Sequence, residues 1–233
     1  MVQQVQENAS AGVIEQLRSR ISRLTGSGRV LTGKTFPFHE PHLDAALPWG
    51  GLPAGSLHEL VGHAPSITGF LAAFLARVRP GRPILWITSE QQPYAPGLAA
   101  FGLDHRRLTI AWARRPQDRL WAFEDALRTP GFAAVIAEVD NADLTETRRL
   151  QLAAESGNGL GLLVRRDAAP SAALTRWRVD TVLGDGRSPR WSVTLERCRG
   201  GQPASWLVEF DHASLHFRLV AALADRSLAA AAE

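Results

Sequence analysis

The chain has 233 residues, of which 45% are hydrophobic and 21% charged, and its formal net charge is +3. This composition is typical of a folded globular protein and excludes a disordered chain, and the single cysteine, Cys198, excludes an internal disulfide. The apolar run at 70–76 is far too short to span a membrane, and residues 1–10 lack the apolar segment of a secretory signal. We therefore expect a cytoplasmic protein.

Residues 1–25 are expected to carry an amphipathic helix. Four apolar residues recur at spacings of three, four and three: Ile14, Leu17, Ile21 and Leu24. This is the period of a helix with one apolar face. Glycine and serine end the pattern, so we expect a linker over 26–41. Two alternatives remain open for the stripe: it folds back onto its own domain, or it docks on another subunit or a partner.

Residues 42–220 are expected to form one α/β core domain. Five strand-length apolar runs alternate with helical stretches: Leu57–Val61, Ile84–Thr88, Leu108–Ala111, Ala133–Val139 and Leu160–Val164. This alternation predicts a mostly parallel twisted sheet flanked by helices. After residue 170 the helices stop, and four further runs predict antiparallel strands at the C-terminal edge. Residues 221–233 are alanine-rich and are expected to be a tail.

A glycine-rich turn and the segments after it resemble the RecA family. The residues that carry the resemblance are Leu43-Asp44, Gly50-Gly51-Leu52-Pro53, Ser89-Glu90 and Ala99-Ala100-Phe101-Gly102-Leu103-Asp104. The resemblance covers most of 42–220 and implies a RecA-like core. It also implies that Glu90 stands where the family places the glutamate that activates the hydrolytic water.

The segment after the first core strand is a degenerate phosphate-binding loop. A working loop reads G-x-x-x-x-G-K-[ST], with lysine on the phosphates and a hydroxyl on Mg²⁺. Aligned from Gly62, this chain has Ser66 followed by Ile67, Thr68 and Gly69 where the loop needs glycine, lysine and hydroxyl. We therefore expect a vestigial nucleotide loop, no cofactor and no catalytic residue.

Carboxylates and arginines near the strand ends leave alternatives open. Glu138 and Asp140 follow a central strand, but neither is in clean register with the family's Mg²⁺-orienting aspartate. Both loops that hold single-stranded DNA in the RecA family are short here, so we expect weak DNA binding at best. Four arginines are candidate phosphate contacts: Arg165, Arg166, Arg176 and Arg178. The alternative is a solvated basic surface.

A second resemblance is more specific and points to the ImuA family. The segments that carry it are Leu47-Pro48-Trp49-Gly50-Gly51-Leu52-Pro53, His58-Glu59-Leu60, the helical stretch 144–155, Leu174-Thr175-Arg176-Trp177-Arg178-Val179 and Leu195–Gly201. It implies a non-catalytic accessory protein of SOS-induced error-prone translesion synthesis. The implied partners are an ImuB-type Y-family polymerase homologue, an error-prone replicative-type polymerase and, as a further candidate, RecA. Self-association through the N-terminal helix is another candidate.

Two other functions remain open: a SulA-type cell-division inhibitor, which is also RecA-like without a phosphate-binding loop, and a residual ATPase. Trp49 lies in a glycine- and proline-containing loop that we expect to be exposed. It is a candidate partner contact together with the N-terminal stripe. His212 and His216 have metal-like spacing, but they span a turn and a strand, and we expect no metal site there.

Overall fold

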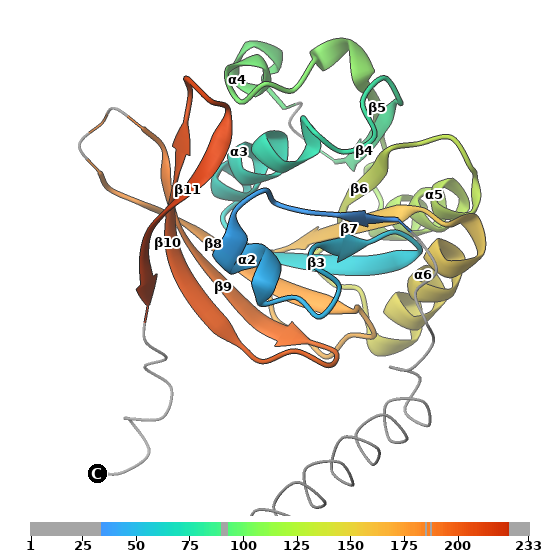
Figure 1. Ribbon diagram of the computed structural model, residues 1–233. Coiled ribbons are helices and arrows are strands. Elements are labelled where there is room, and N and C mark those ends of the chain that lie inside the picture. Colours follow the sequence, from blue (N-terminus) through green and yellow to red (C-terminus); the bar gives the residue numbers. More distant parts are fainter. Residues whose placement is uncertain (1–33, 90–92, 185, 187, 224–233) are drawn as a thin grey trace, which may run out of the picture. The chain divides into compact units, whose positions relative to one another are not determined.

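A computed structural model describes residues 34–89, 93–184, 186 and 188–223 (Figure 1). Within these ranges a nine-stranded sheet has the order β11-β10-β9-β8-β3-β7-β6-β4-β5, and a small second sheet pairs β1 with β2. The strands are β1 Thr35–Phe36, β2 Leu52–Pro53, β3 Ser56–Gly62, β4 Ile84–Thr88, β5 Leu108–Trp112, β6 Ala134–Glu138, β7 Leu160–Arg165, β8 Thr175–Val182, β9 Arg190–Cys198, β10 Ala204–Asp211 and β11 His216–Leu223. The helices are α2 Pro41–Ala45, α3 Ala64–Leu75, α4 Ala95–Ala100, α5 Pro116–Arg128 and α6 Leu144–Gly157, with the 3₁₀ turn η1 at His105–Arg107.

The sheet is parallel through its centre and antiparallel at the C-terminal end. Strands β3 to β8 pair in parallel, whereas β9, β10 and β11 add antiparallel neighbours beyond β8. The apolar runs that alternate with helices have become the parallel strands, because strands buried on both faces need continuous apolar sequence. The predicted fold class, a mostly parallel α/β sheet with antiparallel C-terminal strands, is confirmed.

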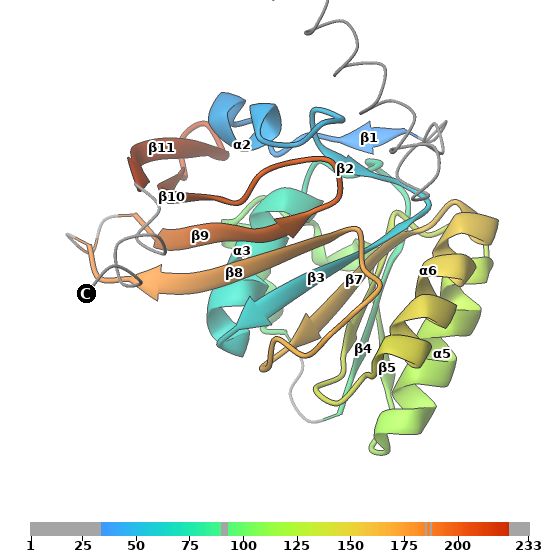
Figure 2. The ribbon, with the colours of Figure 1, turned by 90° about the horizontal axis from the view of Figure 1, so that it is seen from below.

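Helices cover both faces of the parallel strands (Figure 2). Helix α3 packs on one face, over β3 and β8, while α5 and α6 pack on the other. Side chains on β3 alternate between the two: Leu60 belongs to the core under α3 and Leu57 to the core under α5 and α6. The α3 side is rich in aromatic rings, and Phe38 lies within 5.1 Å of Trp177, centroid to centroid.

The chain differs from the sequence expectation at three places. Helix α3 begins at Ala64, inside the segment that was expected to be a nucleotide loop. Residues 35–38, expected to belong to the linker over 26–41, pack on the domain: Thr35–Phe36 forms β1 and Phe38 is buried. Strand β11 continues to Leu223, three residues into the expected tail. The N-terminal helix and residues 26–33 lie outside the described residues.

Candidate functional site

The junction between β3 and α3 is where a phosphate-binding loop would lie. Strand β3 ends at Gly62 and α3 begins at Ala64, so His63 alone connects them. A phosphate cradle needs several consecutive backbone N–H groups that converge on the anion from a loop. Here the corresponding residues, 64–68, already form the first turns of the helix. Pro65 suits this arrangement, because proline fits the first turn of a helix.

The first residues of the predicted nucleotide loop are occupied by structural contacts. Gly62 has a φ of +148°, and a Cβ there would overlap the carbonyl oxygen of Val179. The Ser66 hydroxyl lies 2.7 Å from Oγ1 of Thr181 and accepts the backbone N–H of the same residue at 3.2 Å. These contacts tie the start of α3 to β8. The hydroxyl oxygen of Ser66 is therefore already hydrogen-bonded to Thr181 of β8.

The remaining loop residues are also used by the fold. Ile67, in place of the second glycine, is buried in the core on the α3 side. Thr68, in place of the lysine, donates its hydroxyl to the carbonyl of Ala64 at 2.8 Å. A Cβ on Gly69, in place of the Mg²⁺ hydroxyl, would lie 3.3 Å from the rings of Phe101 and Trp191. The structure therefore brings these residues together as the packed start of a helix.

The carboxylates at the end of β6 and just after it are held by side chains and backbone of the domain. Glu138 accepts Nε1–H of Trp86 at 2.7 Å on one oxygen and the hydroxyl of Thr88 at 2.8 Å on the other. Asp140 accepts the backbone N–H of Arg166 at 3.0 Å. Glu90 lies outside the described residues. Glu138 therefore joins two neighbouring strands.

Two of the predicted DNA-contact arginines meet on one buried carboxylate. Arg165 donates from Nη1 to Glu59 at 3.0 Å, and Arg176 donates from Nε to the other oxygen of Glu59 at 2.7 Å. Arg165 also bonds Asp167 at 3.0 Å, and Arg176 bonds the carbonyls of Ala168 and Ala169. Burial and these bonds commit both guanidinium groups to the domain.

The other two predicted DNA-contact arginines are closer to solvent. Arg178 donates from Nε to Glu196 at 2.6 Å, and this pair is partly exposed. The Arg166 side chain is 82% exposed, with its nearest carboxylate, Asp140, at 3.7 Å. The four arginines therefore do not form one basic surface. Arg166 is the member best placed to meet a phosphate.

The connection from β7 to β8, residues 166–174, is held by arginines that the sequence did not single out. Arg197 donates to the carbonyls of Ser171 and Ala173, and Arg199 donates to that of Ala172. The hydroxyl of Thr147 on α6 accepts the N–H of Ala172. The sequence signal for the neighbouring pairs of Arg165 and Arg176 was Glu59, the one carboxylate in β3, because a buried charge needs a partner.

His58 is buried beside Glu59 on β3, but it faces the α3 side. Its Nε2 lies 3.1 Å from the carbonyl of Pro53 and therefore carries the proton, and its Nδ1 lies 2.8 Å from Oγ1 of Thr175. Burial lowers the pKa of His58 to about 4. The neutral imidazole therefore serves as a structural link between three segments.

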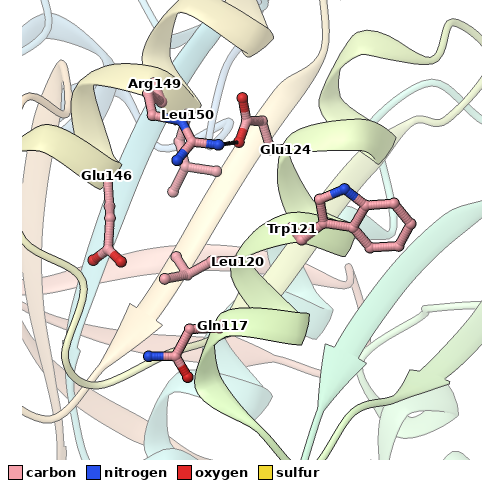
Figure 3. Close-up of a pocket in the computed structure, with 7 residues that line it drawn as sticks. All are labelled: Gln117, Leu120, Trp121, Glu124, Glu146, Arg149 and Leu150. Carbon is pink, nitrogen blue, oxygen red and sulfur yellow. Dashed lines mark hydrogen bonds and ion pairs between the residues drawn. The ribbon is translucent and has the colours of Figure 1, made fainter.

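A shallow surface pocket lies between α5 and α6 (Figure 3). Its floor is formed by Leu120 and Leu150, and Glu124 pairs with Arg149 across it at 2.5 Å. Trp121 lines the rim, and its indole points away from Arg149 in Figure 3. The lining includes no serine, cysteine, lysine or histidine. Its apolar floor and charged rim are features of a surface for protein contact.

Other candidate residues are placed as follows. Trp49 is half-buried and packs against the core on the α3 side. His212 bonds the carbonyl of Ala100, His216 bonds that of Ser214, and among the described residues no cluster of histidine, cysteine or acidic residues could hold a metal ion. In the same part of the chain, no helix is long and apolar enough to cross a membrane. The four stripe residues, Ile14, Leu17, Ile21 and Leu24, lie outside the described residues.

Comparison with known proteins adds two relationships. The chain is 38% identical to "Protein ImuA" of Caulobacter vibrioides, and the alignment covers 83% of this chain and 92% of that protein. It is 30% identical to "Cell division inhibitor SulA" of Serratia marcescens over 52% of this chain and 75% of that protein. It is 28% identical to "Cell division inhibitor SulA" of Edwardsiella piscicida, and that alignment covers 38% of this chain and 53% of that protein. No family model matches the chain.

Proposed function

Because the chain belongs to the ImuA family, we propose that it is a non-catalytic accessory protein of SOS-induced error-prone translesion DNA synthesis. It acts through protein contacts and neither binds nor hydrolyses ATP. The partner types are those that the family resemblance implies: an ImuB-type Y-family polymerase homologue, an error-prone replicative-type polymerase and RecA.

The observation that carries the non-catalytic part is the single-residue connection between β3 and α3. His63 alone separates strand from helix, so no loop is left to surround a phosphate. Ile67 and Gly69 are packed and Thr68 is bonded within the helix, so the chemistry and the backbone shape of the loop are both absent at this junction. The RecA-like core then serves as a scaffold.

In this proposal the chain has the two working parts expected from its sequence, an N-terminal arm and a core domain. Residues 1–25 form an arm that docks on a partner or on a second copy, and the core carries the remaining contacts. The stripe of Ile14, Leu17, Ile21 and Leu24 is the arm's contact surface. Burying four such side chains contributes on the order of 6–10 kcal/mol before the costs of association. Trp49 is a lesser candidate contact, because its side chain already packs against the core on the α3 side.

Isothermal titration of the full chain with Mg²⁺–ATP tests the non-catalytic part. We expect binding no tighter than about millimolar, equivalent to about −4 kcal/mol. The matched control is the triple substitution Ile67→Gly, Thr68→Lys and Gly69→Thr, which restores the side-chain pattern. It should not restore binding, because residues 64–68 remain helical. Micromolar, Mg²⁺-dependent binding by the natural chain would contradict the proposal.

A pull-down tests the accessory role. The full chain is the bait, and the ImuB-type protein and RecA of the same bacterium are offered as purified partners. Binding to either one supports the role, and binding to neither contradicts it.

A second candidate function has its own observation. The similarity to SulA of Serratia marcescens covers 75% of that protein, whose name is cell division inhibitor. If this chain acted in the same way, its overproduction would give filamentous cells, and it would retain the division GTPase in the pull-down. Normal cell length together with retention of the ImuB-type protein favours the accessory role.

A further inference from the structure

Strand β5 has a free edge. It ends the nine-stranded sheet, and β4 is its one strand neighbour in the part of the chain that the structure describes. The backbone N–H of Ala113 donates to the carbonyl of Thr88 at 3.0 Å. Because backbone groups alternate in direction along a strand, those of Ile110 and Trp112 point away from β4. They are oriented to pair with one further strand.

This edge lacks the usual protection against pairing. Natural edge strands carry charges, prolines or bulges that prevent another strand from adding. The five residues of β5 are Leu, Thr, Ile, Ala and Trp, and their register with β4 is continuous. The opposite edge strand, β11, carries Arg218 and faces an irregular register between Leu207 and Val208. The two edge strands therefore differ: β11 has a charged residue and an irregular register, and β5 has neither.

Two exposed tryptophans lie on β5 and on α5, the helix that follows it. Trp112 is 57% exposed, and strand alternation places it on the same face as Leu108, which packs against the core on the α3 side. Trp121 is 70% exposed and lies on α5, which covers the opposite face over β4 and β6. Its indole points away from Arg149 of α6 (Figure 3), and α6 packs over β3 and β7, farther from β5. A strand added to β5 would meet Trp112 on the face of the sheet that α3 covers.

Positive charge at the C-terminal end of β5 favours one kind of incoming strand. Arg114 and Arg115 follow the strand, are exposed, and form no ion pair with any described residue. Asp118 is the one carboxylate in 113–118, so this segment remains positively charged. An incoming strand is favoured if it carries acidic residues at this end, because opposite charges attract across a pair of strands.

The same charges argue against two other occupants. Residues 1–33 of this chain contain four arginines and two glutamates, so the N-terminal arm is itself basic. A second copy paired antiparallel through β5 would bring Arg114 and Arg115 towards its Arg106 and Arg107. Like charges at that position destabilise such a pair.

We propose that the free edge of β5 binds an extended segment of a partner protein by strand addition. The segment has an apolar side chain that meets Trp112, and acidic residues that lie beside Arg114 and Arg115. Main-chain hydrogen bonds to Ile110 and Trp112 supply the pairing, and the side chains of Trp112, Arg114 and Arg115 select the sequence. This inference rests on the proposed function, in which the protein acts through protein contacts, and names the surface and the chemistry of one of them.

Fluorescence anisotropy with the full chain tests the proposal on defined peptides. The first peptide alternates Val and Thr and ends in Asp and Glu, the second ends in two lysines, and the third is the acidic peptide with a central proline. We expect the acidic peptide to bind at least about tenfold more tightly than either of the others. Equal binding of the acidic and lysine peptides, or no binding of the acidic peptide, overturns the proposal.

A matched pair of variants locates the contact. Ile110→Pro removes an outward N–H that the native sheet does not use, whereas Ile110→Val keeps it. We expect Ile110→Pro to weaken acidic-peptide binding at least about tenfold and Ile110→Val to leave it within about twofold. Unchanged binding by a folded Ile110→Pro protein overturns the proposal.

Amide exchange in the natural protein covers the case in which the proline variant does not fold. The backbone amides of Ile110 and Trp112 should exchange freely in the protein without peptide, and they should become protected when the acidic peptide is bound. Protection in the free protein means that another part of the chain or a second copy occupies the edge, and this overturns the proposal. Peptide binding without retention of an ImuB-type protein or RecA would refute the assigned function and leave the β5 edge site standing.

Discussion

Arg165 and Glu59 form an ion pair in which both side chains are 0% exposed, with Nη1 of Arg165 at 3.0 Å from Oε1 of Glu59. Arg176 occupies the other carboxylate oxygen at 2.7 Å. One buried acid on the central strand β3 therefore pairs with two arginines, one from each neighbouring strand. Removal of the acid would leave both guanidinium groups without their buried partner.

We expect Glu59→Gln to lower the free energy of unfolding by about 3–5 kcal/mol, because breaking a buried pair leaves uncompensated charge. The matched control is Glu196→Gln, which breaks the partly exposed pair with Arg178 and should cost less than about 1 kcal/mol. Urea unfolding of both variants measures the two values. A loss below that of the control would mean that Glu59 is not needed to hold these strands.

The buried His58 predicts a stability that falls in mild acid. Its pKa is lowered from 6.5 to about 4, so the unfolded chain binds a proton that the folded chain does not. Stability is therefore complete above about pH 6.5 and is lost as the pH falls towards about 4, by about 2 kcal/mol between pH 7.5 and 5. Urea unfolding at the two pH values measures the loss. In His58→Gln this part of the pH dependence should disappear, while that of the carboxylates remains.

DNA binding should be weak and should depend on Arg166. Arg165 and Arg176 are committed to Glu59, whereas the Arg166 side chain is 82% exposed. We expect no submicromolar binding to single-stranded DNA at about 200 mM salt, and a salt slope lowered by about 1 in Arg166→Ala. Anisotropy with two unrelated oligonucleotides measures both. Tight binding at that salt concentration would give DNA a larger role in the function. A salt slope unchanged by Arg166→Ala would place the DNA contact elsewhere on the protein.

The N-terminal stripe predicts a loss of association without a loss of folding. In Leu17→Asp with Ile21→Asp, two charges replace apolar contacts in the arm, and burying them at an interface is unfavourable. We expect an unchanged circular dichroism spectrum and unfolding midpoint, together with loss of the self-association or partner binding that the natural chain shows. Light scattering and pull-down provide the readouts. An unfolded double variant would mean that the stripe belongs to the domain's own core.

The sequence predicted the α/β order well because its signal is local. Runs such as Leu160–Val164 are apolar and strand-length, and the alternation with helices follows directly from them. The start of α3 was expected too late, because the first residues after Gly62 were read as a loop by analogy with nucleotide-binding proteins. In the structure, Pro65 and the packing of Ile67 allow the helix to begin at once.

The arginines show what the sequence could not resolve. Arg165, Arg166, Arg176 and Arg178 look alike in sequence, but the first and third meet on Glu59 and the second faces solvent. That distinction depends on the register of β7, β3 and β8, which brings together residues more than 100 positions apart. The free edge of β5 also depends on strand order, a global property of the sheet.

The connection through His63 fixes how α3 lies on the sheet. Hinge motions need residues that can absorb a change in backbone angles, and a strand and helix joined by one residue offer little such slack. Ser66 and Thr181 fasten the same end of the helix a second time. A ligand at this junction would have no second arrangement of α3 to favour.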